Sequence, residues 1–549
     1  MLLQLPNQAE PLTLKGPQLF VDWRNVDQGM LEWMADGKKV SQWGGEEDPL
    51  PHAATAYGIA LEGAHPELVG PMLPMDKPWE QGYLMFVNNI LREDGKYRLW
   101  YTVVPDDFRY REDRGYDFDC GWVLCYAESR DGFHWVKPEL GIMQFEGQET
   151  NWVYGREINA NYFSSGCVFR DDNPRCPDSE RYKLIYRSIE TPGDMDAWRA
   201  RQMERFDGDC DPRCLARNYN TPSNAPMAEG LTLQYSGKRM RGETCSPLSG
   251  AVSPDGIHWT PIEEPLMMYC SEQMNACFWD PATEKYIGCF RMNRAGRRTV
   301  GRSETADFRK WPTPTPCLEA PLTWHPSHDI MHCPILKYPG TEDLYVMLAT
   351  VFRRNSDCRD LQLAVSADSY YWNWLPGDTT ADRRQGTVWP FDDIEFGDNF
   401  VELPDGRIGV PVAAFAYPYK YPRHLISGER TPPLGEAGYA VFKPGRLCSV
   451  SAPDRGEFST RCFRMTGSRV TLNFETYGHG GYILAELRRK SGEPIPGYTF
   501  GEFRPLSGDE LDRPLAWSGS DDLSPLRGEN IRICFRLHMS RIYAFELKD

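Results

Sequence analysis

Two short stretches, SRDGFHW at residues 129–135 and SPDGIHW at residues 253–259, decide the fold that we predict for this chain. In each stretch the Asp-Gly pair fits a tight turn whose glycine has a positive φ, and the Asp side chain can cap nearby backbone N–H groups. The closing Trp would pack between neighbouring sheets. A feature that recurs along a chain is typical of a scaffold, so we assign His134 and His258 to the scaffold as well.

These stretches belong to a three-strand unit that occurs five times. Each unit has an apolar strand, a turn rich in Asp, Asn, Gly and Pro, a second strand rich in Tyr and Leu, and later a third strand that ends in a Ser, Asp, Trp signature. The units begin at MFVNNIL (85–91), SGCVFRDDNP (165–174), NACFWDPATE (275–284), MHCPILKYPG (331–340) and NFVELPDG (399–406). One unit cannot bury both of its faces alone, so we expect the five units to pack radially as the blades of a β-propeller.

The repeat divides the chain into three segments. Residues 75–444 are predicted to form the propeller, with a polar insertion at about 190–245 that forms a loop or a small helical excursion. Residues 1–74 form an N-terminal segment, in which the strand QLFVDW (18–23) could close the fifth blade. Residues 445–549 alternate as strands do and contain no helical pattern, which is typical of a β-sandwich. The predicted fold class is therefore all-β, a five-bladed propeller followed by a C-terminal β-sandwich.

Composition limits the partners that we expect. The 549 residues carry 61 Lys and Arg against 78 Asp and Glu, a formal net charge of -17, so nucleic acid and anionic membranes would be repelled. The apolar runs are too short to span a bilayer, and the first residues lack the pattern of a signal peptide. We therefore expect a cytoplasmic protein, or one whose signal has been removed. The 16 cysteines form no CxxC pair, which favours free, buried thiols over a zinc site.

The blade rhythm over roughly residues 75–445, with its SRDGFHW and SPDGIHW hairpins, resembles the five-bladed propeller glycoside hydrolases of families 32, 43, 62 and 68, the fructosidase and arabinanase group. A sandwich after the propeller is similar to the arrangement of the invertase-like enzymes of family 32. The resemblance implies a glycoside hydrolase that cleaves a furanoside or related saccharide. Such an enzyme uses one protonated carboxyl group as the acid and one ionised carboxylate as nucleophile or base.

In the families resembled, the catalytic carboxyl groups stand at the starts of the innermost strands. Glu272, just before the third unit, takes the place of the acid catalyst by blade order. Glu80, just before the first unit, is a candidate for the nucleophile or base. The second unit offers Asn161 and Tyr162 but no carboxylate, so Asp329, before the fourth unit, is the other candidate partner of Glu272.

Other polar and aromatic residues near the same strand ends suit sugar recognition through ring stacking and hydrogen bonds to hydroxyl groups. The substrate-binding candidates are Asp22, Trp79, Arg291, Trp324, His332 and Asp398. The imidazoles of His325, His328 and His332 could hold a divalent metal, but the segment is not a regular helix, and hydrogen bonding to a sugar is favoured. We therefore expect no metal and no cofactor. The basic run Arg294, Arg297, Arg298 and Arg302 is typical of a solvated hairpin, although it could favour an anionic sugar.

Two other functions stay open. Because the second blade lacks an acid, the propeller could bind a carbohydrate without cleaving it. A glycoside phosphorylase or transglycosylase on the same scaffold would need a basic anion pocket in place of a positioned water. In each case the expected partner is a small saccharide or oligosaccharide, and the chain is compatible with a monomer or a homo-oligomer. No P-loop, GxSxG or Rossmann fingerprint occurs.

Overall fold

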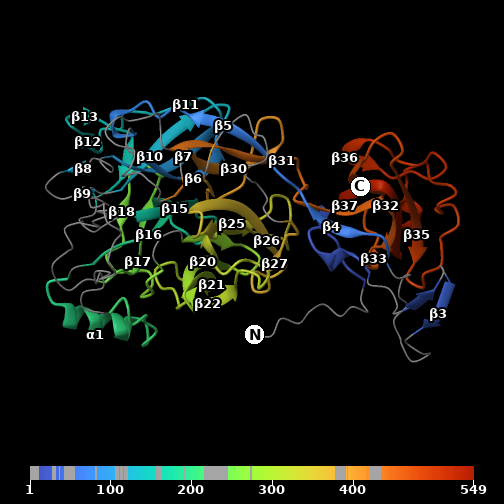
Figure 1. Cartoon of the computed structure of the whole chain (residues 1–549), viewed down its shortest axis with the longest axis horizontal. Coiled ribbons are helices and arrows are strands. Elements are labelled where there is room, and N and C mark those ends of the chain that lie inside the picture. Colours follow the sequence, from blue (N-terminus) through green and yellow to red (C-terminus); the bar gives the residue numbers. More distant parts are fainter. Residues whose placement is uncertain are drawn as a thin grey trace.

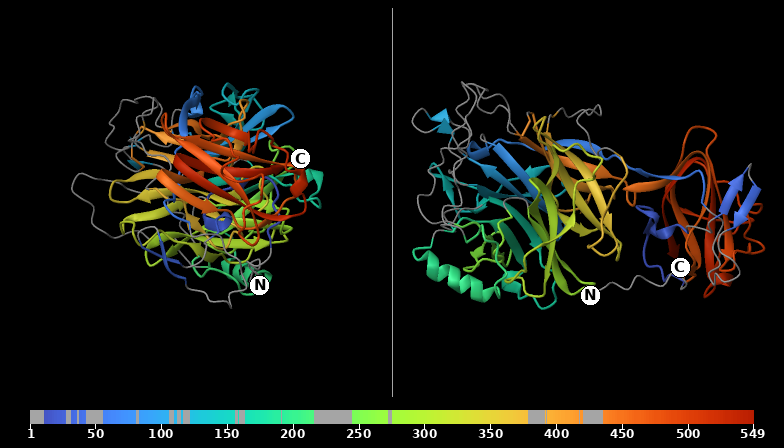
Figure 2. Two further views of the ribbon diagram at one scale, coloured as in Figure 1. Left: turned by 90° about the vertical axis from the view of Figure 1, so that its right-hand side faces the viewer. Right: turned by 60° about the horizontal axis from the view of Figure 1, so that its bottom comes forward.

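The computed structural model describes most of the chain as two β lobes (Figure 1). The described residues are 11–27, 32–35, 38–42, 56–80, 83–105, 110–111, 115–116, 122–155, 158, 164–190, 192–215, 245–271, 275–377, 391, 393–416, 418–419 and 435–549. The larger lobe holds the repeated units and the smaller lobe holds the C-terminal strands, with the C-terminus inside it. Figure 2 shows the same two lobes from two further directions.

Five antiparallel sheets form the larger lobe, one for each unit of the sequence. Blade one contains β6 (Tyr83–Glu93), β7 (Lys96–Val104), β10 (Val123–Ser129), β11 (Trp135–Val136) and β14 (Trp152–Tyr154); blade two contains β15 (Ser164–Arg170), β16 (Tyr182–Arg187), β17 (Leu248–Ser253) and β18 (Thr260–Pro261). Blade three contains β19 (Ala276–Asp280), β20 (Lys285–Arg294), β21 (Arg297–Thr305) and β22 (Thr315–Leu318); blade four contains β23 (His328–His332), β24 (Ile335–Lys337), β25 (Tyr345–Arg353), β26 (Cys358–Ser366) and β27 (Asn373–Trp374). Blade five contains β28 (Asp393–Phe396), β29 (Val401–Glu402), β30 (Ile408–Phe415), β31 (Gly435–Phe442) and β5 (Glu67–Leu73).

The blades form a closed ring around their innermost strands. β6 contacts β15, β15 contacts β19, β19 contacts β24, β25 contacts β28, and β30 of blade five contacts β6 of blade one. Each blade therefore touches the next, and the fifth touches the first. The predicted all-β fold class and the five-bladed propeller are confirmed.

The SxDGxHW stretches form the turns that the sequence predicts. The Ser129 hydroxyl accepts the Gly132 N–H at 2.9 Å, and the Asp131 carboxylate accepts the backbone N–H groups of Phe133 and His134. Gly132 has a φ of +80°, which a side chain would disfavour. The second hairpin repeats this pattern. The role of the motif is structural, as expected.

These hairpins also connect neighbouring blades. The Trp100 indole of blade one donates to the Gly256 carbonyl of the second hairpin at 2.7 Å. The Tyr439 hydroxyl of blade five donates to the Gly132 carbonyl of the first hairpin at 2.9 Å. Trp259 is buried in the same hydrophobic cluster as Trp100. Each turn therefore gives a hydrogen-bond acceptor to an adjacent sheet.

The strand that closes the fifth blade differs from the one that the sequence suggested. β5 pairs with β31 and completes the sheet of blade five. β1 (Gln18–Leu19), from the segment that we expected to close the ring, pairs with β37 of the smaller lobe instead. The expected ring closure by residues 18–23 is wrong. β1 is only two residues long, and its cross-strand partners are Phe545 and Ala544.

The smaller lobe is built around its last strand, β37 (Asn530–Lys548). This strand pairs with β1, β32 (Cys448–Ser459), β33 (Phe463–Arg464), β34 (Arg469–Thr476) and β35 (Tyr482–Arg489), while β36 (Asp509–Pro514) and β4 (Ala60–Gly63) extend the network at its two ends. The lobe buries its own apolar cluster. The strand content agrees with the expectation for this segment, and its division into two sandwich layers stays a prediction.

The remaining elements are short. Two-strand ribbons form from β2 (Glu32–Ala35) with β3 (Lys38–Gln42), β8 (Tyr110–Arg111) with β9 (Gly115–Tyr116), and β12 (Gln144–Phe145) with β13 (Gln148–Glu149). The helices are α1 (Met195–Arg205), within the predicted insertion, and the 3₁₀ turns η1 (Trp23–Asn25), η2 (Pro78–Glu80), η4 (Asp178–Glu180) and η5 (Ser524–Leu526). The Asp194 carboxylate caps α1 by accepting the Ala197 N–H at 3.0 Å. Within the described ranges, no helix has the length and apolar character needed to cross a membrane.

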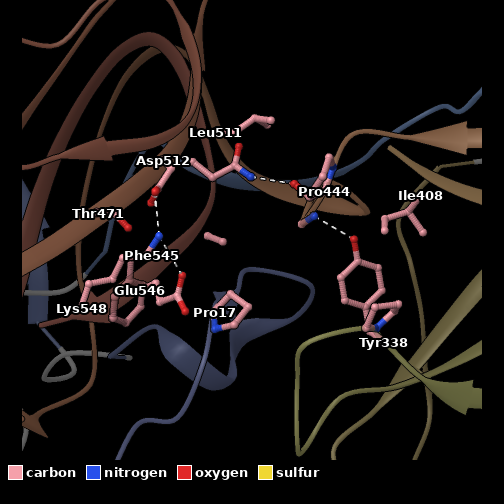
Figure 3. A pocket seen from close by; sticks show the side chains of 14 residues that line it. Pro17, Tyr338, Ile408, Pro444, Thr471, Leu511, Asp512, Phe545, Glu546 and Lys548 are labelled. Carbon is pink, nitrogen blue, oxygen red and sulfur yellow. Dashed lines mark hydrogen bonds and ion pairs between the residues drawn. The ribbon is translucent and has the colours of Figure 1, made fainter. Parts of the chain in front are cut away.

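The two lobes share a hydrophobic cluster and line an open pocket. Leu19, Val21 and Ala544 of the smaller lobe belong to one buried cluster with side chains of blades four and five. Beside this cluster lies a cavity of about 300 Å³, lined from both lobes (Figure 3). The Tyr338 hydroxyl of blade four accepts the Gly445 N–H there at 2.7 Å.

Candidate functional site

Polar and apolar side chains from the innermost strands meet at the propeller axis. A narrow cavity of about 10 Å³, close to the size of one water, lies among them. It is lined by Phe86, Val87, Asn88, Gly166, Asn275, His332, Phe396 and Asp398, which come from or adjoin the innermost strands of all five blades. Because those strands each begin their blade, their starting ends face one end of the ring.

His332 and Asp398, two of the predicted substrate-binding residues, meet directly at this axis. The His332 Nε2 lies 2.9 Å from a carboxylate oxygen of Asp398, and both side chains are buried. The His332 Nδ1 lies 3.1 Å from the Phe396 carbonyl oxygen and 3.5 Å from Glu395 Oε1. Burial lowers the pKa of His332, but the carboxylates of Asp398 and Glu395 raise it by more, so it lies above its usual value. The imidazole is therefore held between two carboxyl groups.

Both of these carboxyl groups bind protons more tightly than usual. Burial raises the pKa of Glu395 to about 7, although Arg359 and His332 oppose the rise. Burial also raises the pKa of Asp398, against the effect of His332. The axis therefore contains a carboxylic acid that is partly protonated at neutral pH, which is the state that a general acid requires.

Arg359 compensates the charge of this network from blade four. Its Nε lies 3.0 and 2.9 Å from the two carboxylate oxygens of Asp393, and its backbone N–H donates to Asp393 at 2.6 Å. Its Nη1 contacts the Glu395 carboxylate. The guanidinium lies over the rings of Phe415 and Tyr419, with its carbon 4.8 and 4.6 Å from the ring centres. A buried cation with this many partners fixes the geometry of blades four and five at the axis.

Asp329, a predicted catalytic carboxylate, lies in β23 with no exposed surface and is bound by two arginines. The Arg354 Nε donates to it at 2.7 Å, and the Arg354 Nη2 also contacts it. The Arg298 Nη1 of blade three lies 3.4 and 3.3 Å from the two carboxylate oxygens. The two guanidinium groups fix the position of this carboxylate on β23.

Glu80, the other predicted partner, is held in a buried ion pair within blade one. Its carboxylate lies 2.6 Å from the Lys137 Nζ and 2.5 Å from the Tyr101 hydroxyl, and it accepts the Lys77 N–H at 3.0 Å. The neighbouring Trp79 indole donates to the Asn151 side chain at 3.0 Å. None of these described contacts reaches the axial side chains, so the structure does not bring Glu80 and Trp79 together with His332.

Glu272 lies outside the described residues, but the residues on either side of its segment are placed. The Ser271 hydroxyl donates to the Asn275 side chain at 2.5 Å and lies 2.9 Å from the Arg291 carbonyl oxygen. Asn275 lines the axial cavity, and Arg291, a predicted sugar-binding residue, is 4% exposed. Both neighbours of the segment therefore stand at the start of β19, next to the axis.

The remaining candidates lie apart from the axial network. Asp22 lies in the smaller lobe, where it binds the Arg24 side chain at 2.8 Å and caps η1, so its expected place near the strand starts is wrong. Trp324 is half-buried against Trp374 of blade four, with 4.8 Å between ring centres. Asp22 was misplaced because it depended on ring closure by residues 18–23.

The three imidazoles near blade four do not converge. His325 Nδ1 lies 2.8 Å from the Ser327 hydroxyl, whereas His332 faces Asp398. His328 lies between them at the start of β23. Across the described part of the chain, no group of three or more His, Cys, Asp or Glu residues is arranged to hold a metal ion. The expectation that the site needs no metal stays a prediction.

Comparison with known proteins gives structural neighbours but no sequence family. No family model matches the sequence, and no curated protein matches it. A fructofuranosidase from Schwanniomyces occidentalis complexed with fructose matches with a TM-score of 0.37 and 12% identity, over 85% of this chain and 97% of that one. An α-L-arabinofuranosidase from Podospora anserina in complex with cellotriose matches with a TM-score of 0.37 and 11% identity, over 70% of this chain and 98% of that one.

An endo-arabinase from Bacteroides thetaiotaomicron matches with a TM-score of 0.34 and 11% identity, over 69% of this chain and 98% of that one. These neighbours are glycoside hydrolases. The resemblance to five-bladed propeller glycoside hydrolases that the sequence suggested is confirmed at the level of the fold. At such TM-scores the likeness carries no argument about the reaction or the substrate of this chain, which are argued from its own residues.

Proposed function

We propose that this chain hydrolyses the glycosidic bond of a furanoside or related saccharide at the end of the propeller axis where the innermost strands begin. One observation carries the proposal: buried carboxyl groups on the innermost strands of blades four and five are held in place by arginine and histidine side chains. Asp329 is bound by two guanidinium groups, whereas burial raises the pKa of Glu395 to about 7. Glycoside hydrolysis uses two carboxyl groups, one that donates a proton to the leaving oxygen and one that attacks the anomeric carbon or activates a water.

The sequence assigns the proton donor to Glu272, and the placement of its neighbours supports this assignment. Asn275 lines the axial cavity, and the Ser271 hydroxyl is hydrogen-bonded to it. Arg298, on β21 of the same blade, contacts the Asp329 carboxylate. In the proposed reaction the Glu272 carboxyl group gives its proton to the leaving oxygen. The Asp329 carboxylate attacks the anomeric carbon or activates a water for that attack. Of the two proposed partners we favour Asp329, because Glu80 is bound to Lys137 within blade one.

The decisive test is Glu272→Gln in the full chain. We expect turnover to fall by roughly 10² to 10⁴-fold on any nitrophenyl furanoside that the wild type cleaves, because an amide cannot donate the proton. The melting temperature should stay within about a degree of the wild type. Glu263→Gln, an exposed glutamate in the loop before β19, is the matched control and should keep full activity. Undiminished turnover by Glu272→Gln would reject the assignment.

One observation favours a second function, a propeller that binds a carbohydrate without cleaving it. Within the described residues, the carboxylates near the axis already have cationic partners: Asp329 has Arg354, Asp393 and Glu395 have Arg359, and Asp398 has His332. A carboxylate with occupied oxygens is a weak nucleophile. Saccharide binding measured by calorimetry, with no product released by wild-type protein, would establish this second function.

A further inference from the structure

Four arginines gather at the end of blades three and four where β21 and β23 begin. Arg297 and Arg298 are the first residues of β21, Arg353 ends β25, and Arg354 follows it. We call this set the arginine cluster. His328, the first residue of β23, is the cross-strand partner of Arg353, and its carbonyl oxygen accepts from Arg297. The cluster therefore surrounds the start of an innermost strand.

The arginine cluster holds more positive charge than its described carboxylate partners neutralise. Asp329 lies between Arg298 and Arg354, and Asp360 pairs with Arg353 at 2.6 Å. No carboxylate is among the described contacts of Arg297. In a chain with a net charge of -17, such a local excess of cations is unusual and attracts anions.

Arg298 retains capacity for a further acceptor. Its contacts with Asp329, at 3.3 and 3.4 Å, are longer than the 2.7–2.9 Å typical of a charge-assisted hydrogen bond. Its side chain is 19% exposed, and that of Arg354 is 42% exposed. A guanidinium group has five N–H donors in a plane and binds carboxylate or sulfate oxygens in pairs.

The surroundings of His328 agree with a positive local potential. Burial lowers the pKa of this histidine, and electrostatic interactions with Arg353, His325 and Arg297 lower it further, against the effect of Asp329. The imidazole is thus held neutral near pH 7 and can exchange hydrogen bonds with hydroxyl groups. Trp324 lies beside it, with 6.5 Å between ring centres, and offers a partly exposed aromatic ring.

We propose that the arginine cluster is a subsite for a negatively charged sugar residue, a uronate or a sulfated sugar, in the saccharide that this propeller binds. This inference rests on the proposed function, because the subsite adjoins Asp329, the proposed partner of Glu272. Arg298 would bind the anionic group, and Trp324 would contact the ring face. The chemical basis is the pairing of guanidinium with carboxylate or sulfate.

Binding to matched ligands tests the inference with wild-type protein. Isothermal titration in 0.15 M salt would compare trigalacturonate with its carboxyl-reduced form, which is neutral, and with a sulfated galactose trisaccharide. We expect an acidic ligand to bind at least tenfold more tightly than the neutral one, and its Kd to rise with salt. A preference for trigalacturonate identifies a carboxylate subsite, and a preference for the sulfated trisaccharide identifies a sulfate subsite. Equal binding of acidic and neutral ligands overturns the inference.

Variants then locate the subsite. Arg298→Gln should weaken the acidic ligand at least tenfold more than the neutral one, and Arg298→Lys should recover part of the loss. Arg294→Gln removes the same charge from the same hairpin, but its side chain is 68% exposed and pairs with Glu319, so it should bind like the wild type. If Arg298→Gln has a lower melting temperature than the wild type, the same binding experiment is done with Arg297→Gln. An unchanged acidic preference in a folded Arg298→Gln or Arg297→Gln protein overturns the inference.

Failure of the inference can be told apart from failure of the proposed function. Cleavage of neutral saccharides without any acidic preference keeps the hydrolase and rejects the subsite. Tight binding of an acidic saccharide without cleavage keeps the subsite and rejects hydrolysis.

Discussion

At the scale of single residues, the axis holds more acidic groups than its cations neutralise. Arg359 is bound to Asp393 and also contacts Glu395, and His332 faces both Glu395 and Asp398. With Arg359, Asp393, Glu395 and Asp398 fully ionised, these buried side chains would carry a net negative charge. Burial therefore shifts the balance toward protonation of the carboxyl groups.

This balance predicts how stability depends on pH. Burial raises the pKa of Glu395 from 4.5 to about 7, so between these values the folded protein holds a proton that the unfolded chain has released. The free energy of unfolding should therefore fall as pH rises through this range, and the shifts of Asp398 and His332 act in the same direction. Glu395→Gln should reduce this fall, measured by urea denaturation at pH 5 and pH 7.5. The exposed-site variant Glu263→Gln should retain it, and an unchanged pH dependence in Glu395→Gln would contradict the prediction.

The sequence predicts some residues of this network, but it does not predict which of them contact one another. His332 and Asp398 could be named because the sequence places both near the expected starts of the innermost strands, whereas in the structure His332 ends β23 and Asp398 follows β28. Their direct contact depends on how far blades four and five approach each other, which no local pattern records. Arg359 was missed because it lies on β26, the third strand of its blade counted from the axis, and nothing near it in the sequence marks a cation that two carboxylates of the next blade bind.

At the scale of elements, the repeated hairpin explains why the blade count could be predicted. A Ser, an Asp and a residue with positive φ form the same local bonds in three blades, although the third position is Gly132, Gly256 or Ser369. Such local bonds do not depend on distant contacts. Ring closure does depend on distant contacts. For this reason the sequence wrongly suggested residues 18–23 as the closing strand, whereas β5 closes the blade.

The two glycine hairpins make a matched pair for measuring what each turn contributes. Both glycines have a φ near +80°, so Ala should cost roughly 1–2 kcal/mol at either site. A methyl group on Gly256 would also lie 2.6 Å from the Trp100 ring, whereas one on Gly132 would meet nothing closer than 3.5 Å. Gly256→Ala should therefore be less stable than Gly132→Ala by a further 1–3 kcal/mol or so. Chemical denaturation measures the free energy of unfolding of both variants. Equal decreases would show that the Trp100 ring moves away from the added methyl group without a loss of stability.

At the scale of the whole molecule, the N-terminal segment connects the two lobes. β4 pairs with β32 in the smaller lobe, and a few residues later β5 pairs with β31 in blade five. The shared cluster of Leu19, Val21 and Ala544 with blades four and five adds apolar contact across the junction. Neither lobe therefore has a complete set of strands and core contacts without the other.

This shared construction predicts that the lobes unfold together. Leu487 is fully buried in the cluster of the smaller lobe and Leu363 in the cluster shared by both lobes. Either leucine changed to alanine should lose about 2–5 kcal/mol through lost burial and the cavity left behind. Because the lobes share strands and core, differential scanning calorimetry should give a single transition that both variants shift downward by similar amounts. Two transitions, with Leu487→Ala moving only one of them, would mean that the smaller lobe folds independently of the propeller.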